Sequence, residues 1–167
     1  MTSYCSWDLT VLVISVITTI VLLGAAVWCF VKYKAYSHSK QLSTKIMCLS
    51  SSLLCIVLLF GTLSFLPIKV SINDSEITVT KIIGTVSIKI ADIQQIERTK
   101  AVDTVNSVRI FASGGFWGYI GKLNSPALGD YFSYVTNSAD KITIKTNDKI
   151  YIISCNNPEA MINAVMR

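Results

Sequence analysis

Residues 9–31 read LTVLVISVITTIVLLGAAVWCFV, and residues 46–66 read IMCLSSSLLCIVLLFGTLSFL. Neither run contains a charged side chain. At about 1.5 Å of rise per residue, a helix over either run reaches roughly 30 Å, which is enough to cross the hydrocarbon core of a bilayer. The sequence therefore predicts a two-helix transmembrane hairpin within residues 1–67, followed by a separate domain over residues 68–167.

The connecting loop, residues 32–45, indicates how the hairpin is oriented. Lys32, Lys34, Lys40 and Lys45 are its charged residues, and it has no acid. By the positive-inside rule this loop faces the cytoplasm, which places residues 68–167 on the extracytoplasmic side of a bacterial inner membrane. A cleaved signal peptide is the alternative, but residues 1–8 have no basic residue and the first run is longer than a secretory hydrophobic region.

Small residues stand at matching depths in the two runs. Gly24 and Ala25 lie about as far from the loop as Ser51 and Ser52 do. Small side chains let membrane helices approach closely, so these four residues are candidates for helix–helix packing. The alternative is that small residues are simply common in membrane helices.

Composition limits what the remaining 100 residues do. The chain of 167 residues has a net charge of +5, but residues 68–167 hold 11 Lys or Arg against 9 Asp or Glu. That balance is typical of a solvated surface and gives no nucleic-acid signature. The cysteines form no C-x-x-C pair, and Cys155 is expected to be a small buried apolar residue.

Alternating apolar residues predict β-strands after the hairpin. Alternation is clear over residues 68–72, 77–79, 86–90, 108–110, 134–136, 142–144 and 150–152. Asn157-Pro158-Glu159 then supplies a helix cap, a first-turn proline and an acid near the helix start. Together these signals predict a mainly-β sandwich or partly open barrel that is capped by a C-terminal helix.

The most individual stretch joins glycines to aromatic residues. Residues 109–123 read RIFASGGFWGYIGKL, and residues 128–137 read LGDYFSYVTN. This combination resembles the bacterial pleckstrin-homology-like (PH) domains, in which an arginine and a Gly-Gly-aromatic-x-Gly segment precede a Leu-Gly-x-aromatic strand. The resemblance implies two packed antiparallel sheets closed by a C-terminal helix. It implies little about activity, since PH-like folds bind lipids, peptides and proteins.

Members that bind phosphoinositides carry Lys and Arg around the first hairpin turn. The corresponding turn here, residues 73–76, reads NDSE and is acidic. This difference argues against phosphoinositide binding.

The glycine-aromatic segment has two interpretations. Gly114, Gly115, Gly118 and Gly121 permit unusual backbone angles or close approach, which favours a structural role with the aromatic side chains in the core. In the other interpretation some aromatics stay exposed and form a partner surface or contact the outer leaflet. The candidate surface residues are Arg109, Phe116, Trp117 and Tyr119.

No constellation for catalysis is apparent in the sequence. The single histidine, His38, lies in the lysine-rich loop, and no nucleophile, phosphate-loop or metal-ligand pattern occurs. We therefore expect no enzyme activity, no metal site and no cofactor.

Two functions remain: a membrane-anchored interaction or scaffolding module, or a ligand- or envelope-stress-sensing domain coupled to the hairpin. The expected partners are the lipid bilayer and other proteins, or a second copy of the chain.

Overall fold

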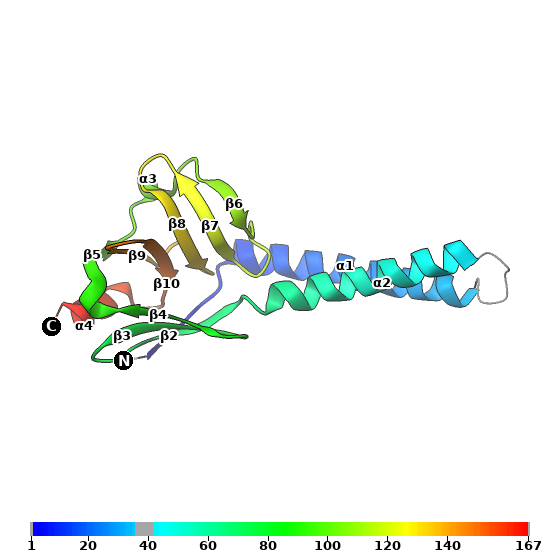
Figure 1. The fold of residues 1–167 in the computed structure, drawn as a ribbon, viewed down its shortest axis with the longest axis horizontal. Helices are drawn as coiled ribbons and strands as arrows, with labels where there is room; N and C mark the ends of the chain where they lie inside the picture. Colours follow the sequence, from blue (N-terminus) through cyan, green and yellow to red (C-terminus); the bar gives the residue numbers. More distant parts are fainter. Residues whose placement is uncertain (1, 36–41, 167) are drawn as a thin grey trace.

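The computed structural model describes residues 2–35 and 42–166, which form a β-rich head and a long helical hairpin (Figure 1). The hairpin consists of α1 (Leu9–Ala35) and α2 (Leu42–Leu63). Both helices are long and apolar enough to cross a membrane, and most of their apolar side chains face outward, as Trp28 does with 65% of its surface exposed. The predicted loop at 32–45 includes residues 36–41, which lie outside the described residues.

The helix ends differ slightly from the apolar runs. Both helices extend into the lysine-rich segment, since α1 ends at Ala35 and α2 begins at Leu42. A long lysine side chain can keep its charge in water from a helical backbone beside an apolar surface. Residues 64–66 leave α2 through a turn, with the Leu66 N–H donating to the Leu63 carbonyl at 3.1 Å. Pro67 follows, and its ring disfavours the helical conformation at the preceding residue, Leu66.

The two helices contact each other through small residues. The Ser52 hydroxyl donates to the Ala26 carbonyl at 3.3 Å, and both residues are buried. Ala25 and Ser51 are half-buried beside them, whereas Gly24 is exposed and a Cβ on it would meet nothing within 4 Å. The role of these four small residues in packing stays a prediction.

The head contains two sheets. The first has the order β1-β2-β3-β4 and is antiparallel throughout. Its strands are β1 (Thr2–Tyr4), β2 (Pro67–Ile72), β3 (Glu76–Lys81) and β4 (Thr85–Lys89). Val70, Val79 and Val86 lie opposite one another across it, so the alternation in the sequence places one apolar face on the core.

The second sheet has the order β5-β9-β10-β8-β7-β6. Its strands are β5 (Ile93–Arg98), β6 (Val108–Ala112), β7 (Tyr119–Ser125), β8 (Gly129–Val135), β9 (Lys141–Thr146) and β10 (Ile150–Ser154). β10 pairs with β8 in parallel, whereas the other pairs are antiparallel. The resemblance had implied antiparallel sheets, and the parallel pair arises because the β9–β10 hairpin joins the sheet beside β8.

The main core lies between the two sheets and under α4 (Pro158–Val165). It combines Val70, Ile72, Ile77, Val79 and Ile88 with Ile96, Ile142, Ile144, Ile153, Cys155 and Met161. The helix starts as expected, with the Asn157 side chain accepting a hydrogen bond from Ala160 N–H at 3.3 Å. The two sheets stay separate, so the fold is a sandwich capped by a helix, and the predicted fold class is confirmed.

Three strands were not predicted from the sequence. β1 carries few apolar residues, β5 is interrupted by polar side chains, and β7 begins within the glycine-aromatic stretch. β1 matters most for the layout, because it pairs Ser3 with Val70 and so joins the N-terminus to the head. The domain boundary at residue 67 stays a prediction, and residues 2–8 contact the head on the other side of it.

Candidate functional site

The glycine-aromatic loop, residues 113–118, connects β6 to β7 and packs against the start of α1. The Trp117 N–H donates to the Ser15 hydroxyl at 2.9 Å, and that hydroxyl is 3.5 Å from the Gly115 carbonyl it donates to. Gly115 is buried, and a Cβ on it would lie 2.9 Å from the Ile14 side chain. The loop therefore fits closely against the second turn of the first long helix.

Trp117 lies at this junction and not in the core between the sheets. Its ring is 5.8 Å from the Trp7 ring in an edge-on arrangement and 5.1 Å from the Phe116 ring. Its backbone φ is +62°, an unusual value for a bulky residue. Its indole Nε1 is buried without a hydrogen-bond partner in the described part of the chain. Since aromatic pairs stabilise contacts beyond their buried area, the three rings favour a rigid joint between loop and helix.

Gly118, the last residue of this loop, and Gly121, on β7, each lie close to the backbone of a neighbouring strand. Gly118 has a φ of +127°, and a Cβ there would lie 2.7 Å from the Val135 carbonyl oxygen. Gly121 has a φ of +130°, and a Cβ there would collide with the Phe111 backbone on β6. These positions favour the structural interpretation for the glycines, because any side chain would push neighbouring strands apart.

Asp8 caps α1 and holds it to the loop that leaves β8. Its Oδ1 accepts from Val11 N–H at 2.7 Å, and its Oδ2 accepts from both the backbone N–H and the hydroxyl of Ser138. Its own N–H donates to the Thr136 carbonyl at 3.0 Å. Partial burial alone would raise the pKa of Asp8, but these hydrogen bonds outweigh it and hold the pKa below the usual value.

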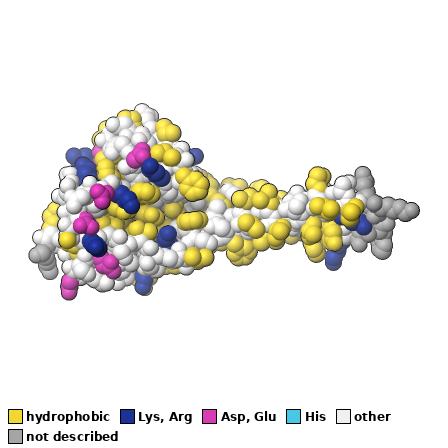
Figure 2. All heavy atoms as spheres, viewed as in Figure 1, with side chains coloured by type: hydrophobic (Ala, Val, Ile, Leu, Met, Phe, Trp, Pro, Cys, Tyr) yellow, Lys and Arg dark blue, Asp and Glu magenta, His cyan; other side chains and the backbone are white. Residues whose placement is uncertain are grey.

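The C-terminal end of α2, which we call its root, contacts the head through residues 64–66 and 82–83. Ile82 N–H donates to the Leu66 carbonyl and Ile83 N–H to the Ser64 carbonyl, each at 3.0 Å. Phe65, Ile82 and Ile83 are exposed there, and the Lys81 ammonium lies 5.6 Å from the Phe65 ring. Figure 2 shows hydrophobic side chains gathered where the head meets the hairpin and along the hairpin itself.

A second exposed apolar group lies on the head, which we call the apolar ridge. It starts at the short helix α3 (Ala101–Thr104) and continues along β6, an edge strand of its sheet. Phe111 is its most exposed member, at 83%. The ridge consists of Val102, Val105, Val108, Ile110 and Phe111.

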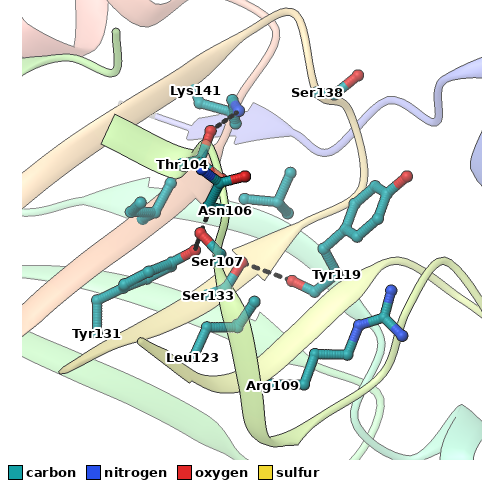
Figure 3. Close-up of a pocket in the computed structure, with 12 residues that line it drawn as sticks. Thr104, Asn106, Ser107, Arg109, Tyr119, Leu123, Tyr131, Ser133, Ser138 and Lys141 are labelled. Carbon is teal, nitrogen blue, oxygen red and sulfur yellow. Dashed lines mark hydrogen bonds between the residues drawn. The ribbon is translucent and has the colours of Figure 1, made fainter. Parts of the chain in front are cut away.

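Beneath the ridge, the second face of the six-stranded sheet forms a cleft of about 380 Å³ (Figure 3). Its floor is a small apolar cluster with Leu123, Val135 and Ile152, all buried. The segment that covers it is held by the Tyr131 hydroxyl, which donates to Ser107 at 2.9 Å. The remaining lining residues are Thr104, Asn106, Arg109, Tyr119, Ser133, Ser138 and Lys141.

The structure separates the four residues predicted as a partner surface. Arg109 and Tyr119 line the cleft, whereas the Trp117 N–H donates to Ser15 on α1 and the Phe116 ring packs on the Trp117 ring. The Arg109 guanidinium also covers Gly114, so a side chain at that position would displace the guanidinium. Lys141 and Ser138 were not predicted, since they are ordinary polar residues 29 or more positions from Arg109 with no local motif.

Cysteine and metal chemistry find no support in the described residues. Cys155 is buried as expected, and burial raises the pKa of its thiol to about 11. Burial likewise raises the pKa of Cys5 to about 12. Both thiols are therefore protonated at neutral pH. Within residues 2–35 and 42–166, no group of three His, Cys, Asp or Glu side chains is placed to hold a metal ion.

Comparison with known proteins agrees with the fold. A family model described as "Bacterial PH domain" matches residues 68–167. The chain belongs to the bacterial PH domain family, as the resemblance of the glycine-aromatic stretch indicated. No curated protein and no solved structure matches it.

Proposed function

We propose that this protein is a membrane-anchored, non-enzymatic interaction module whose head lies on the extracytoplasmic face and binds another protein. The apolar ridge is the observation that carries the proposal. Its side chains are exposed on α3, at Val105 just after it, and on an edge strand, and exposed apolar groups of this kind mark interaction surfaces. The occupant we propose is an apolar segment of a second protein.

Lipid is a less suitable occupant for the ridge than for the hairpin root. In Figure 1, strand β6 of the ridge lies nearer the hairpin than α3 does. A bilayer crossed by the hairpin therefore does not cover the whole length of the ridge. Phe65, Ile82 and Ile83 at the root of α2 are better placed for lipid, and Lys81 beside them suits the headgroup region.

Site-specific photocrosslinking in cells tests the ridge. A photoreactive residue at Phe111 should form a discrete crosslinked product, and the substitution Ile110→Lys in the same chain should abolish it. A photoreactive residue at Ser87, exposed on β4, is the matched control and should give no such product. A product that contains only this chain would replace the partner with self-association, and no product at Phe111 would refute the proposal.

The orientation is tested by labelling single cysteines in a cysteine-free variant. The lysine-only loop supports a cytoplasmic position for Ser39. We expect a cysteine at Ser39 to react only after permeabilisation and one at Asn147, in the β9–β10 turn, to react in intact cells. The reverse pattern would place the head in the cytoplasm.

Ligand sensing is the second candidate function, and one contact favours it. Ser138 lines the cleft and also donates two hydrogen bonds to Asp8 at the start of α1. A molecule in the cleft that moved Ser138 would therefore act directly on the cap of a long helix. Ligand-dependent change in amide exchange at residues 9–12 would support sensing.

A further inference from the structure

The cleft on the outer face of the six-stranded sheet combines two cations with an apolar floor. Arg109 and Lys141 come from β6 and β9, which are not neighbours in the sheet, and both contribute to the lining (Figure 3). None of the residues that line the cleft carries a carboxylate. The charge of the cleft is therefore positive.

The cations are not neutralised by close ion pairs. The described part of the chain shows salt bridges from Arg98 and Lys122, and none from Arg109 or Lys141. Lys141 is half-buried and donates to the Thr104 hydroxyl at 3.4 Å. Burial lowers the pKa of Lys141, while the charge of Asp103 nearby opposes that change. A partly dehydrated ammonium gains from an anionic partner.

Three acids next to residues that line the cleft make other contacts, and one of them, Asp140, pairs with Arg98 at 3.5 Å. Asp103 accepts a hydrogen bond from the Lys100 N–H at 2.9 Å. Asp8 accepts hydrogen bonds from Val11 and Ser138. None of these carboxylates lines the cleft.

The residues that line the cleft also limit the size and polarity of the part of the ligand that carries no charge. Leu123, Val135 and Ile152 offer an apolar surface, and hydrogen bonds to neighbours hold the hydroxyls of Tyr131 and Ser133 in place. A volume of about 380 Å³ falls within the usual range for small-molecule sites. A pre-formed concave site with a few fixed polar groups is typical of ligand binding.

We propose that this cleft binds a small organic anion, with its phosphate or carboxylate group at Lys141 and its apolar part on Leu123, Val135 and Ile152. Arg109, at the opposite end of the cleft, adds to the positive charge of the lining (Figure 3). The site is distinct from the protein-binding role of the apolar ridge, although Arg109 lies within the same strand. Lys141, on β9, belongs to the cleft alone.

The experiment is a titration of the full chain, in nanodiscs of phosphatidylcholine, followed by methyl NMR. Phenyl phosphate and phenylacetate are the anionic probes, and benzyl alcohol is the neutral one. We expect saturable shifts of the Leu123, Val135 and Ile152 methyl signals with at least one anion, and at least tenfold weaker binding of benzyl alcohol. Equal binding of benzyl alcohol, or no shift with either anion, would overturn the proposal.

Two variants localise the charge. Lys141→Gln should weaken binding of the anion at least tenfold, whereas Lys145→Gln, farther along β9 and outside this cleft, should leave it unchanged. Unperturbed methyl signals of Ile142 and Ile144 in the core report that each variant is folded. Equal loss in both variants would show that binding follows general surface charge and would refute the site.

A final arm identifies the source of the anion. Nanodiscs that contain phosphatidylglycerol should shift the same methyl signals without added probe if a lipid headgroup reaches the cleft. Absence of that shift, together with binding of phenyl phosphate or phenylacetate, assigns the site to soluble anions.

Discussion

The two long helices enter the head in different ways. α1 is held by contacts with residues about 100 or more positions away in the chain, including Trp117 and Ser138. The segment that follows α2 is joined to the head by backbone hydrogen bonds from Ile82 and Ile83, which lie in the turn between β3 and β4. The difference indicates that α1 is coupled to the folded head through specific side chains, whereas α2 is connected mainly through the backbone.

Trp117→Ala should have the largest effect on the α1 joint. It removes a ring that packs on Trp7 and Phe116, and we expect the free energy of unfolding to fall by about 3 kcal/mol. Denaturant unfolding of the full chain in mild detergent measures this. Trp28→Ala is the control, because that ring is exposed on the hairpin and should cost less than about 0.5 kcal/mol. Equal effects would show that the Trp117 ring has no special role in holding α1 to the head.

Gly115→Val tests the contact between the glycine-aromatic loop and Ile14 on α1. Gly115 and Gly84 both have positive φ, but a Cβ at Gly84 meets nothing within 4 Å. Valine should be strained at both positions, and the additional clash with α1 should make Gly115→Val about 2 kcal/mol more destabilising than Gly84→Val. Similar melting temperatures for the two variants would show that the loop does not press on α1.

Asp8→Ala should cost about 1 kcal/mol, since it removes a helix cap and the bonds to Ser138. The pKa of Asp8 in the folded chain lies below the usual 3.8, so its contribution is complete above that pH. It is lost as the pH falls through the lowered pKa. Stability measured against pH should therefore decline less steeply below pH 3.8 in Asp8→Ala than in the wild type, and parallel curves would contradict this role.

Ile83→Ser should have the smallest effect on folding. Ile83 contacts Ser64 through its backbone, and its side chain is exposed. We expect a change within about 0.5 kcal/mol in detergent. A loss as large as that of Trp117→Ala would mean that the α2 root also depends on side-chain packing.

Much of the architecture could be predicted because its signals are local. The charge-free runs, the alternation of residues such as Val70 and Ile72, and the cap at Asn157 act within a few neighbouring residues. The same alternation left β1 and β5 unpredicted, since β1 is held by pairing with β2 and β5 by pairing with β9. Strand propensity depends strongly on such partners.

The amino-acid sequence alone predicts a hairpin of two apolar helices, a helix-capped β domain and a glycine-aromatic segment of the bacterial PH type. Three further features depend on contacts between distant residues: this segment packs on α1 through Ser15, β10 lies parallel to β8, and Arg109 and Lys141 line one cleft. Periodicity specifies which face of an element is apolar. It does not specify which distant element covers that face, because that choice depends on contacts between residues far apart in the chain.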